Sequence, residues 1–269
     1  MQKFNYHTHT YRCGHADDNM MDEEYVKEFI DKGFKKIAFT DHSPEKETID
    51  KRQRMRMDYS QINEYLTSIK NLKEKYKDKI DIQTGFEIEF LPGQEKNLLE
   101  LKQMTDILVL GQHFIYADDN KDLKIFRKHK FNDEDLIKYA NYIDTAMKLQ
   151  IPDIVVHPDL YMLTRNEFGE IEKKVAEMIC KSAEKYNIPL EINLTEAFMY
   201  LANLKNKISY PCRGFWEVAT NYNIKVIYGI DAHYKEQIRL YEDSIEMVNK
   251  IIGKETIEKL SFCNDKLEI

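Results

Sequence analysis

Seven short apolar runs, separated by polar segments with helical periodicity, most constrain the fold of this chain of 269 residues. The runs are Lys3–His7, Lys36–Thr40, Ile80–Glu87, Ile107–Gly111, Ile154–His157, Leu190–Asn193 and Lys225–Asp231. Several are apolar at nearly every position, which is typical of strands buried on both faces. The helical segments include Asp22–Lys32, Tyr59–Tyr76, Asn132–Leu149, Glu170–Tyr186 and Gly214–Asn221. This alternation predicts βαβ units around a parallel sheet.

The expected fold is therefore α/β, a TIM-like barrel closed or nearly closed by seven strands. We expect one domain over residues 1–269, because α/β barrels often use this length as a single domain. The sequence contains no repeat and no linker rich in Pro, Gly or Ser. Residues 116–132 are expected to form a long surface excursion.

Histidines and acidic residues occur at the ends of these runs. The clusters are His7-Thr-His9 with His15, Asp41-His42, Glu87-Ile-Glu89, Gln112-His113, His157-Pro-Asp159 and Asp231-Ala-His233. In an α/β barrel the carboxyl ends of the strands share one face, where active sites are built. Imidazole and carboxylate groups are ligands for zinc, manganese and iron. The sequence thus predicts a metallohydrolase with its clusters in one mouth.

Some cluster members are expected to have distinct roles. His7 and His9 are two residues apart on a strand, so they share a face and can chelate one ion. The carboxylate of Glu87 can bridge two cations. Asp41 is expected to orient a histidine rather than bind an ion itself. Glu89 has two open interpretations, a place in the substrate pocket or a solvated side chain.

Two further residues, one near the clusters and one in a charge run, are not expected to bind metal. Cys13 lies among the histidines, where packing is favoured over a ligand role. His129 lies within the charge run Lys124–Lys130 and is expected to be exposed.

Composition narrows the class and location of the protein. The net charge of −7 does not favour general affinity for nucleic acid. The four cysteines are widely spaced without a CxxC pair, which favours a reducing, intracellular compartment over a disulfide framework. No apolar run approaches the roughly 18 residues that span a bilayer. We therefore expect a cytoplasmic protein without membrane partners.

The clusters together resemble the polymerase-and-histidinol-phosphatase (PHP) superfamily, in the expected order from His7 to His233. The resemblance implies a distorted (β/α)7 barrel with two or three divalent ions of zinc, manganese or iron. It implies one ion held by His7, His9, Glu87 and Asp231, a second by Glu87, His113 and His157, and a third by His15, His42 and His233. Asp231, His233 and Glu87 are the expected catalytic residues of this set.

Within the superfamily the chain is most similar to the histidinol-phosphatase branch. The supporting strings are His7-Thr-His-Thr, Ile37-Ala-Phe-Thr-Asp-His-Ser-Pro, Arg54-Met-Arg-Met-Asp, Gly85-Phe-Glu-Ile-Glu-Phe, His157-Pro-Asp-Leu and Leu190-Glu-Ile-Asn. The chain departs from the family pattern at Leu194-Thr-Glu-Ala-Phe and at Gly229-Ile230. The resemblance implies hydrolysis of L-histidinol phosphate to L-histidinol and phosphate, in histidine biosynthesis, by attack of a metal-bridging hydroxide.

Arginines are expected to bind the phosphate, because the guanidinium fork matches its oxygens. Arg165 and Arg213 are the preferred candidates, since each is isolated in a loop predicted after the fifth or sixth strand. Arg52, Arg54 and Arg56 form a third basic cluster after the second strand.

Three alternatives stay open from the sequence. The first is a PHP-type phosphoesterase acting on nucleotides or other small phosphate esters. The second is an amidohydrolase, which would need a metal-bridging lysine where the middle strands here offer Glu87 and His113. The third is a metal-dependent interaction module without catalysis. Oligomeric state is left open.

Overall fold

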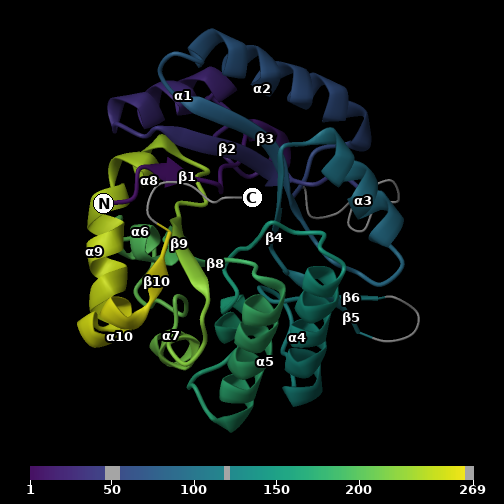
Figure 1. The fold of residues 1–269 in the computed structure, drawn as a ribbon, viewed down its shortest axis with the longest axis vertical. Coiled ribbons are helices and arrows are strands. Elements are labelled where there is room, and N and C mark those ends of the chain that lie inside the picture. The colour runs from purple at the N-terminus through teal and green to yellow at the C-terminus, as the bar shows by residue number, and fades with distance from the viewer. Residues whose placement is uncertain (46–54, 118–121, 264–269) are drawn as a thin grey trace.

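The computed structural model describes residues 1–45, 55–117 and 122–263. Its main element is a curled sheet of eight parallel strands in the order β1-β2-β3-β4-β7-β8-β9-β10, shown in Figure 1. The strands are β1 (Phe4–Asn5), β2 (Lys36–His42), β3 (Asp81–Ile88), β4 (Ile107–Leu110), β7 (Ile154–Val155), β8 (Leu190–Asn193), β9 (Lys225–Gly229) and β10 (Ser261–Phe262). The predicted distorted (β/α)7 barrel is confirmed, with β10 as an additional short strand.

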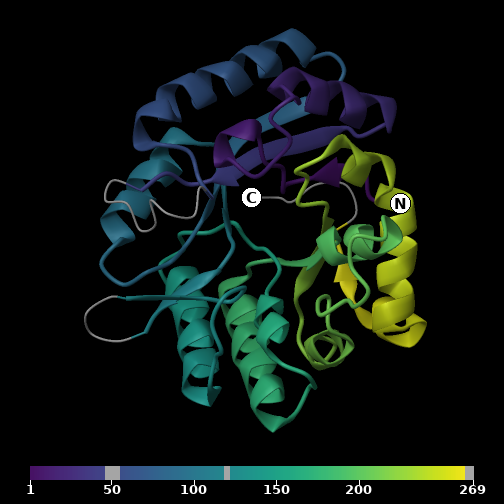
Figure 2. The same cartoon turned by 180° about the vertical axis from the view of Figure 1, so that it is seen from behind.

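Helices cover the outside of this sheet. Their bounds are α1 (Asp22–Asp31), α2 (Ile62–Tyr76), α3 (Glu95–Met104), α4 (Asp133–Lys148), α5 (Glu170–Tyr186), α6 (Thr195–Leu201), α7 (Arg213–Ala219), α8 (Lys235–Arg239), α9 (Tyr241–Ile252) and α10 (Lys254–Lys259). In both views α1 and α2 lie side by side over β2 and β3, and α4 lies beside α5 (Figures 1 and 2). No helix of the described residues is long and apolar enough to cross a bilayer.

The apolar strands are buried on both faces, as their composition predicts. In β4, Ile107 and Val109 belong to a cluster made only of residues from the strands and their ends, which fills the barrel interior. Leu108 and Leu110 alternate with them and pack into the larger core beneath the helices. The helices supply matching apolar stripes, as in α2, where Ile62, Tyr65, Leu66, Ile69 and Leu72 are buried.

The described part of the predicted excursion, residues 116–117 and 122–132, contains regular structure and buried rings. It contains part of the antiparallel hairpin of β5 (Phe114–Tyr116) and β6 (Leu123–Ile125). Phe126 and Phe131 after β6 are buried and stacked on each other, with ring centroids 3.9 Å apart. The hairpin and the stacked rings of Phe126 and Phe131 therefore attach residues 122–131 to the barrel.

The barrel closes through side chains and a single bridge rather than a continuous ladder. The extensions of β1 and β9 meet at one parallel bridge between Thr8 and Ala232. Below it, the amide of Gln2 bonds both backbone groups of Tyr228, at 2.7 and 3.0 Å. The amide oxygen of buried Asn5 accepts a 2.9 Å bond from Ile230 N. This seam joins the strand that precedes His7 to the strand that precedes Asp231.

Candidate metal centre

All nine residues that the sequence predicts as ligands lie together at the carboxyl ends of the strands. His7, His9 and His15 come between β1 and α1, His42 ends β2, Glu87 lies in β3, and the others follow β4, β7 and β9. The imidazole centroids lie close together, with His9 and His233 4.1 Å apart, His9 and His42 4.5 Å, and His113 and His157 4.8 Å. Strand-end placement therefore brings residues that are far apart in sequence into one cluster.

Glu87 lies at the middle of this cluster. Its Oε1 atom is 2.8 Å from Nε2 of His157 and 3.6 Å from Nε2 of His7. Its Oε2 atom is 2.9 Å from Nδ1 of His42 and 3.5 Å from Nε2 of His9. The two oxygens therefore face different sets of imidazoles, which is the geometry that a bridging carboxylate needs.

A second group of imidazoles lies beside Glu87. Nε2 of His15 is 2.9 Å from Nε2 of His233. One ligand atom from each of His9, His42 and His233 lies within 4.8 Å of the others. Another group of this size is formed by His7, His157 and Asp231. The cluster thus has room for more than one cation.

Two members of the cluster leave their strands through left-handed backbone. His157 has φ of 32° and Asp231 has φ of 53°. Non-glycine residues rarely adopt positive φ, and such positions gather at functional sites. Both side chains line the pocket above the cluster, so the unusual backbone occurs where the strand ends meet the site.

The donor set fits divalent cations. Nε2 of His7, both ring nitrogens of His9 and Nδ1 of His157 are buried and make no hydrogen bond among the described residues. Burying polar atoms without partners is unfavourable, and a divalent cation would supply the missing partner. The absence of a side chain at Gly111 leaves space for the carboxylate of Glu87, since a Cβ on Gly111 would lie 1.7 Å from its Oε1.

Further acidic groups hold the imidazoles from behind. Glu191 lies 2.9 Å from Nδ1 of His7, and Glu89 lies 2.7 Å from Nδ1 of His113. Glu89 is buried and also accepts from the backbone of His113, so it is neither solvated nor among the residues lining the pockets described below. Asp41 lies 3.6 Å from Nδ1 of His9, the position expected of an orienting carboxylate.

The local charges favour a bound cation. Burial lowers the pKa of His9, but contacts with Asp231 and Asp41 outweigh it and raise the pKa to about 9. Burial raises the pKa of Glu87, but neighbouring His42, His113 and His7 hold it well below its ordinary value. Glu87 is thus ionised, and its negative charge at the middle of the cluster favours a bound cation.

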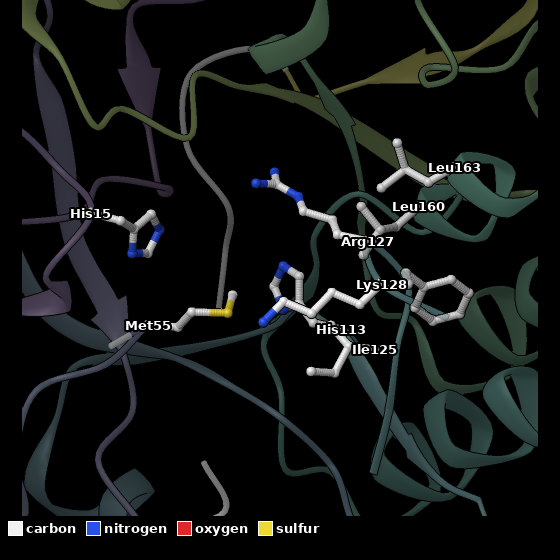
Figure 3. A pocket seen from close by; sticks show the side chains of 9 residues that line it. His15, Met55, His113, Ile125, Arg127, Lys128, Leu160 and Leu163 are labelled. Atoms are coloured by element: carbon white, nitrogen blue, oxygen red, sulfur yellow. The ribbon is translucent and has the colours of Figure 1, made fainter. Parts of the chain in front are cut away.

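Two adjoining pockets open over the cluster. One of about 210 Å³ is lined by Glu87, Asp231, five of the clustered histidines, Arg127, Tyr210 and residues of α6. The other, of about 220 Å³, shares His15, Met55, His113 and Arg127, and adds Ile125, Phe126, Lys128, Leu160 and Leu163. Figure 3 shows His15 and Met55 on one side of this second space and Arg127, Leu160 and Leu163 on the other. The two pockets together form one space, with the candidate metal ligands on one side and apolar side chains on the other.

The arginines expected to bind phosphate do not line these pockets. Arg165 donates to Glu172 and Asp133 and to the carbonyl of Phe131, so neighbouring elements occupy its guanidinium. Arg213 is 64% exposed and pairs with Glu217 one helical turn away. Their loops were expected to open onto the mouth, but both side chains are directed to local carboxylates. The structure thus does not place Arg165 and Arg213 at these pockets, and Arg127 is the arginine that lines both of them.

The third basic cluster is only partly described. Arg52 and Arg54 lie outside the described residues. Arg56 has a side chain that is 8% exposed and donates to the carbonyl of Ser43 at 3.1 Å, which makes it a support for the loop after β2.

Sequence reasoning missed several residues around the cluster. Arg127 stands in a charge run and is exposed like its neighbours, His129 among them, so the sequence does not distinguish it. Glu191 was noted only as part of a family string, although its place at the end of a buried strand matches the other acidic residues. Thr195 belongs to a departure from the family pattern, and its hydroxyl donates to Asp231 at 3.0 Å.

Comparisons with known proteins place the chain in a family. The family model described as the PHP domain matches residues 5–195, which is most of the chain. The chain belongs to the PHP family. A protein of Deinococcus radiodurans named "Probable histidinol-phosphatase" is 24% identical over 259 residues, covering 92% of this PHP chain and 93% of the relative. A Schizosaccharomyces pombe protein with the same name is 27% identical over 256 residues, covering 87% and 81%.

Solved structures share the fold of this PHP chain. The structure of a candidate histidinol phosphatase, hisK, of Listeria monocytogenes has a TM-score of 0.74 at 22% identity, covering 90% of this chain and 99% of that one. The histidinol phosphate phosphatase of Lactococcus lactis, solved with zinc, L-histidinol and phosphate, has a TM-score of 0.67 at 18% identity, covering 95% and 94%.

Proposed function

We propose that this chain is a metal-dependent phosphatase that hydrolyses L-histidinol phosphate to L-histidinol and phosphate. The observation that carries the proposal is the position of Glu87, whose two oxygens face separate sets of buried imidazoles beneath a pocket that contains Arg127. The names of the relatives supply the substrate, and the Lactococcus lactis protein binds zinc, L-histidinol and phosphate together. The whole chain, residues 1–269, is proposed to act as one metallophosphatase domain, and its location in the cytoplasm stays a prediction.

The proposed centre takes two or three ions of zinc, manganese or iron. His7, His9, Glu87 and Asp231 would hold one ion, Glu87 with His113 and His157 a second, and His15, His42 and His233 a third. Bound divalent cations lower the pKa of a water molecule and neutralise charge on phosphoryl oxygens. The buried, unpaired nitrogens of His7, His9 and His157 support this assignment.

The side chains around the ions would position the ester. Arg127 would bind phosphate oxygens, since its guanidinium borders both pockets. Burial lowers the pKa of Arg127, but nearby Tyr210 and Asp231 raise it overall, so the group stays charged. The leaving group would extend toward the apolar side, against Leu160 and Leu163.

Asp231 and His233 lie where they could handle protons of the reaction. Both line the pocket, and Nδ1 of His233 is 3.4 Å from Oδ1 of Asp231. Burial and the neighbouring charge of His9 hold the pKa of His233 well below its ordinary value, which keeps the ring neutral. Thr195 and Asn193 donate to the other oxygen of Asp231, at 3.0 and 3.3 Å, and so fix the carboxylate.

A phosphate-ester panel tests the proposal. Purified protein is stripped of metal, reloaded separately with Zn²⁺, Mn²⁺ or Fe²⁺, and assayed on L-histidinol phosphate, nucleotides, sugar phosphates and a chromogenic aryl phosphate. We expect the highest kcat/KM for L-histidinol phosphate. Equal turnover of all esters would refute the substrate while leaving the phosphatase class, and no turnover with any metal would refute the class.

One observation favours a second candidate, a phosphatase for esters that carry further negative charge, such as nucleotides. Lys128 lies beside Arg127 at the apolar pocket, so two cationic side chains border it. L-Histidinol is itself a cationic amine and gains nothing from this pair. A higher kcat/KM for nucleotides in the same panel would support this candidate.

A further inference from the structure

Arg12 is a buried arginine in the short turn between His9 and His15. It lies in the 3₁₀ helix η1 (Tyr11–Cys13), and its side chain is 1% exposed. All five of its guanidinium N–H groups have acceptors. Two go to Asp22 of α1 at 2.8 and 2.9 Å, two go to Glu64 of α2 at 2.8 Å each, and one goes to the hydroxyl of Thr10 at 3.3 Å.

The contact with Thr10 leads to the metal centre. The Thr10 hydroxyl donates to Oδ2 of Asp41, and the Thr10 backbone N–H donates to the same oxygen at 3.2 Å. The other oxygen of Asp41 lies 3.6 Å from Nδ1 of His9. Arg12 is therefore connected to a candidate ligand through two buried side chains.

The same contacts fix the turn that carries His15. Thr10 caps η1 by accepting from the backbone N–H of Arg12 at 3.3 Å. His15 follows three residues later, where its Nδ1 atom meets the carbonyl of Cys13 at 3.2 Å. Because the guanidinium is held by helices on the outside of the barrel, it ties this turn to a rigid part of the fold.

The geometry requires arginine rather than a general cation. A guanidinium presents five donors in one plane, whereas a lysine ammonium presents three from a single point. An ammonium at this position could pair with Asp22, but it could not reach Asp22, Glu64 and Thr10 at once. Lysine would thus keep the charge and lose the link to the metal centre.

We infer that Arg12 is a positioning residue that sets His9 and His15 for metal binding through Thr10 and Asp41. The inference rests on the proposed metal centre and adds a specific control over its ligands. Outer partners of metal-bound histidines typically contribute 10- to 100-fold in metal affinity or activity. Arg12 acts one step further out, so we expect an effect near the lower end of that range.

The test measures the Zn²⁺ affinity of Arg12→Lys by competition with a chromogenic chelator, with thermal unfolding of the metal-free protein measured alongside. We expect about tenfold weaker binding of at least one ion and a lower kcat with little change in KM. Arg239→Lys is the matched control, because Arg239 also binds a carboxylate, Glu28, through two nitrogens but is 52% exposed on α8. Its zinc affinity should stay within about twofold of wild type.

A double-mutant cycle separates positioning from general stability. Thr10→Val removes the linking hydroxyl and leaves Arg12 with both of its carboxylates. If Arg12 acts through Thr10, the loss of affinity from Arg12→Lys should shrink in the Thr10→Val background, because effects within one network are not additive. If Arg12→Lys does not fold, Glu64→Gln takes its place in the cycle, since Glu64 is 57% exposed and frees one edge of the guanidinium.

The outcomes distinguish this inference from the metal centre itself. Wild-type protein that binds no zinc would overturn the metal centre and the inference with it. A different result would overturn only the inference. In that case the wild-type protein binds zinc, and the Arg12→Lys protein binds it with equal affinity but is less stable. Fully additive losses in the cycle would also overturn it, and a reduced loss in the Thr10→Val background would support it.

Discussion

Nδ1 of His7 lies 2.9 Å from Oε2 of Glu191, and both side chains are fully buried. The contact spans the barrel interior, from the end of β1 to β8. With Nδ1 donating to Glu191, Nε2 of His7 is left to face Glu87 and Asp231 at 3.6 and 3.5 Å, where it would be the atom that binds a cation. A carboxylate behind a histidine is the usual support of a metal ligand.

Glu191→Gln tests that support. The amide keeps the size of the side chain but removes the charge, and Glu191 also accepts from Asn193. We expect zinc affinity to fall about 10- to 100-fold. Glu172→Gln is the control, since Glu172 is buried beneath Arg165 away from the cluster. Equal zinc affinities for the wild type and Glu191→Gln would show that the carboxylate only packs.

Gly111→Ala tests the space reserved beside Glu87. The added methyl would lie 1.7 Å from Oε1 of Glu87 and 2.9 Å from Cε1 of His157, so the proposed bridging carboxylate must move. We expect at least a 100-fold loss of activity in the zinc-loaded protein, an order of magnitude in keeping with a misplaced catalytic group. Gly169→Ala should have little effect, because its nearest contact is the flexible end of Glu172 at 3.2 Å. Normal turnover by Gly111→Ala would contradict the bridging role.

Arg127→Met tests the corrected assignment of the phosphate contact. Loss of a charge-assisted hydrogen bond costs about 1.5–3 kcal/mol, so kcat/KM should fall about 10- to 100-fold. Arg213→Met should stay within about twofold, because Arg213 forms only an exposed ion pair. The reverse ranking in steady-state kinetics would restore the assignment made from the sequence.

Metal removal should lower stability as well as activity. Cations that bind only the folded protein stabilise it by about 2.7 kcal/mol per site at 100 times Kd. For a chain somewhat smaller than this one, each kcal/mol of stability shifts the unfolding midpoint by roughly 2–4 °C. Chelation should therefore lower the midpoint by about 5 °C or more. Differential scanning fluorimetry with and without chelator measures the shift. Coincident midpoints would argue against a cation among these buried groups.

Asp159→Asn tests a buried acid outside the ligand set. Burial raises the pKa of Asp159 to about 7. Hydrogen bonds from Cys212 N and Trp216 Nε1 act in the opposite direction, but burial outweighs them. The folded state therefore holds this proton more tightly than the unfolded state does. Its contribution to stability is fully present below the unfolded pKa near 4 and is lost as the pH rises to about 7.

The measurement is the free energy of unfolding in urea at pH 4, 5.5 and 7, with chelator present. The difference between wild type and Asp159→Asn should change by at most a few kcal/mol over this range, given about 1.4 kcal/mol per pKa unit. A difference that is constant with pH would show that Asp159 is ionised throughout.

Much of the fold could be predicted because the strands are apolar and regularly spaced. β8 and α5 have the predicted bounds, and the other predicted elements lie within a few residues. β10 was missed because two residues, Ser261 and Phe262, carry no periodicity. The hairpin of β5 and β6 was missed because β6 has three residues and overlaps the charge run Lys124–Lys130, which is typical of a solvated loop.

The candidate ligands could be predicted because strand ends of a barrel share one face, a rule that depends only on topology. Side chains on loops follow no such rule. Arg165 and Arg213 each lie near local carboxylates that the sequence does not place in space, whereas Arg127 depends on how the hairpin folds back. The environment of Glu89 could not be predicted for the same reason, since its burial depends on where the fold places His113.

The seam between β1 and β9 joins two parts of the candidate ligand set that lie far apart in the chain. His7 and His9 emerge from the ribosome first, and Asp231 follows more than 200 residues later. At synthesis rates of about 5–20 residues per second, the early histidines wait tens of seconds or less for their partner. A nascent chain therefore carries only part of the proposed ligand set until residue 231 is made, and the proposed centre is complete only when the extension of β9 pairs with that of β1.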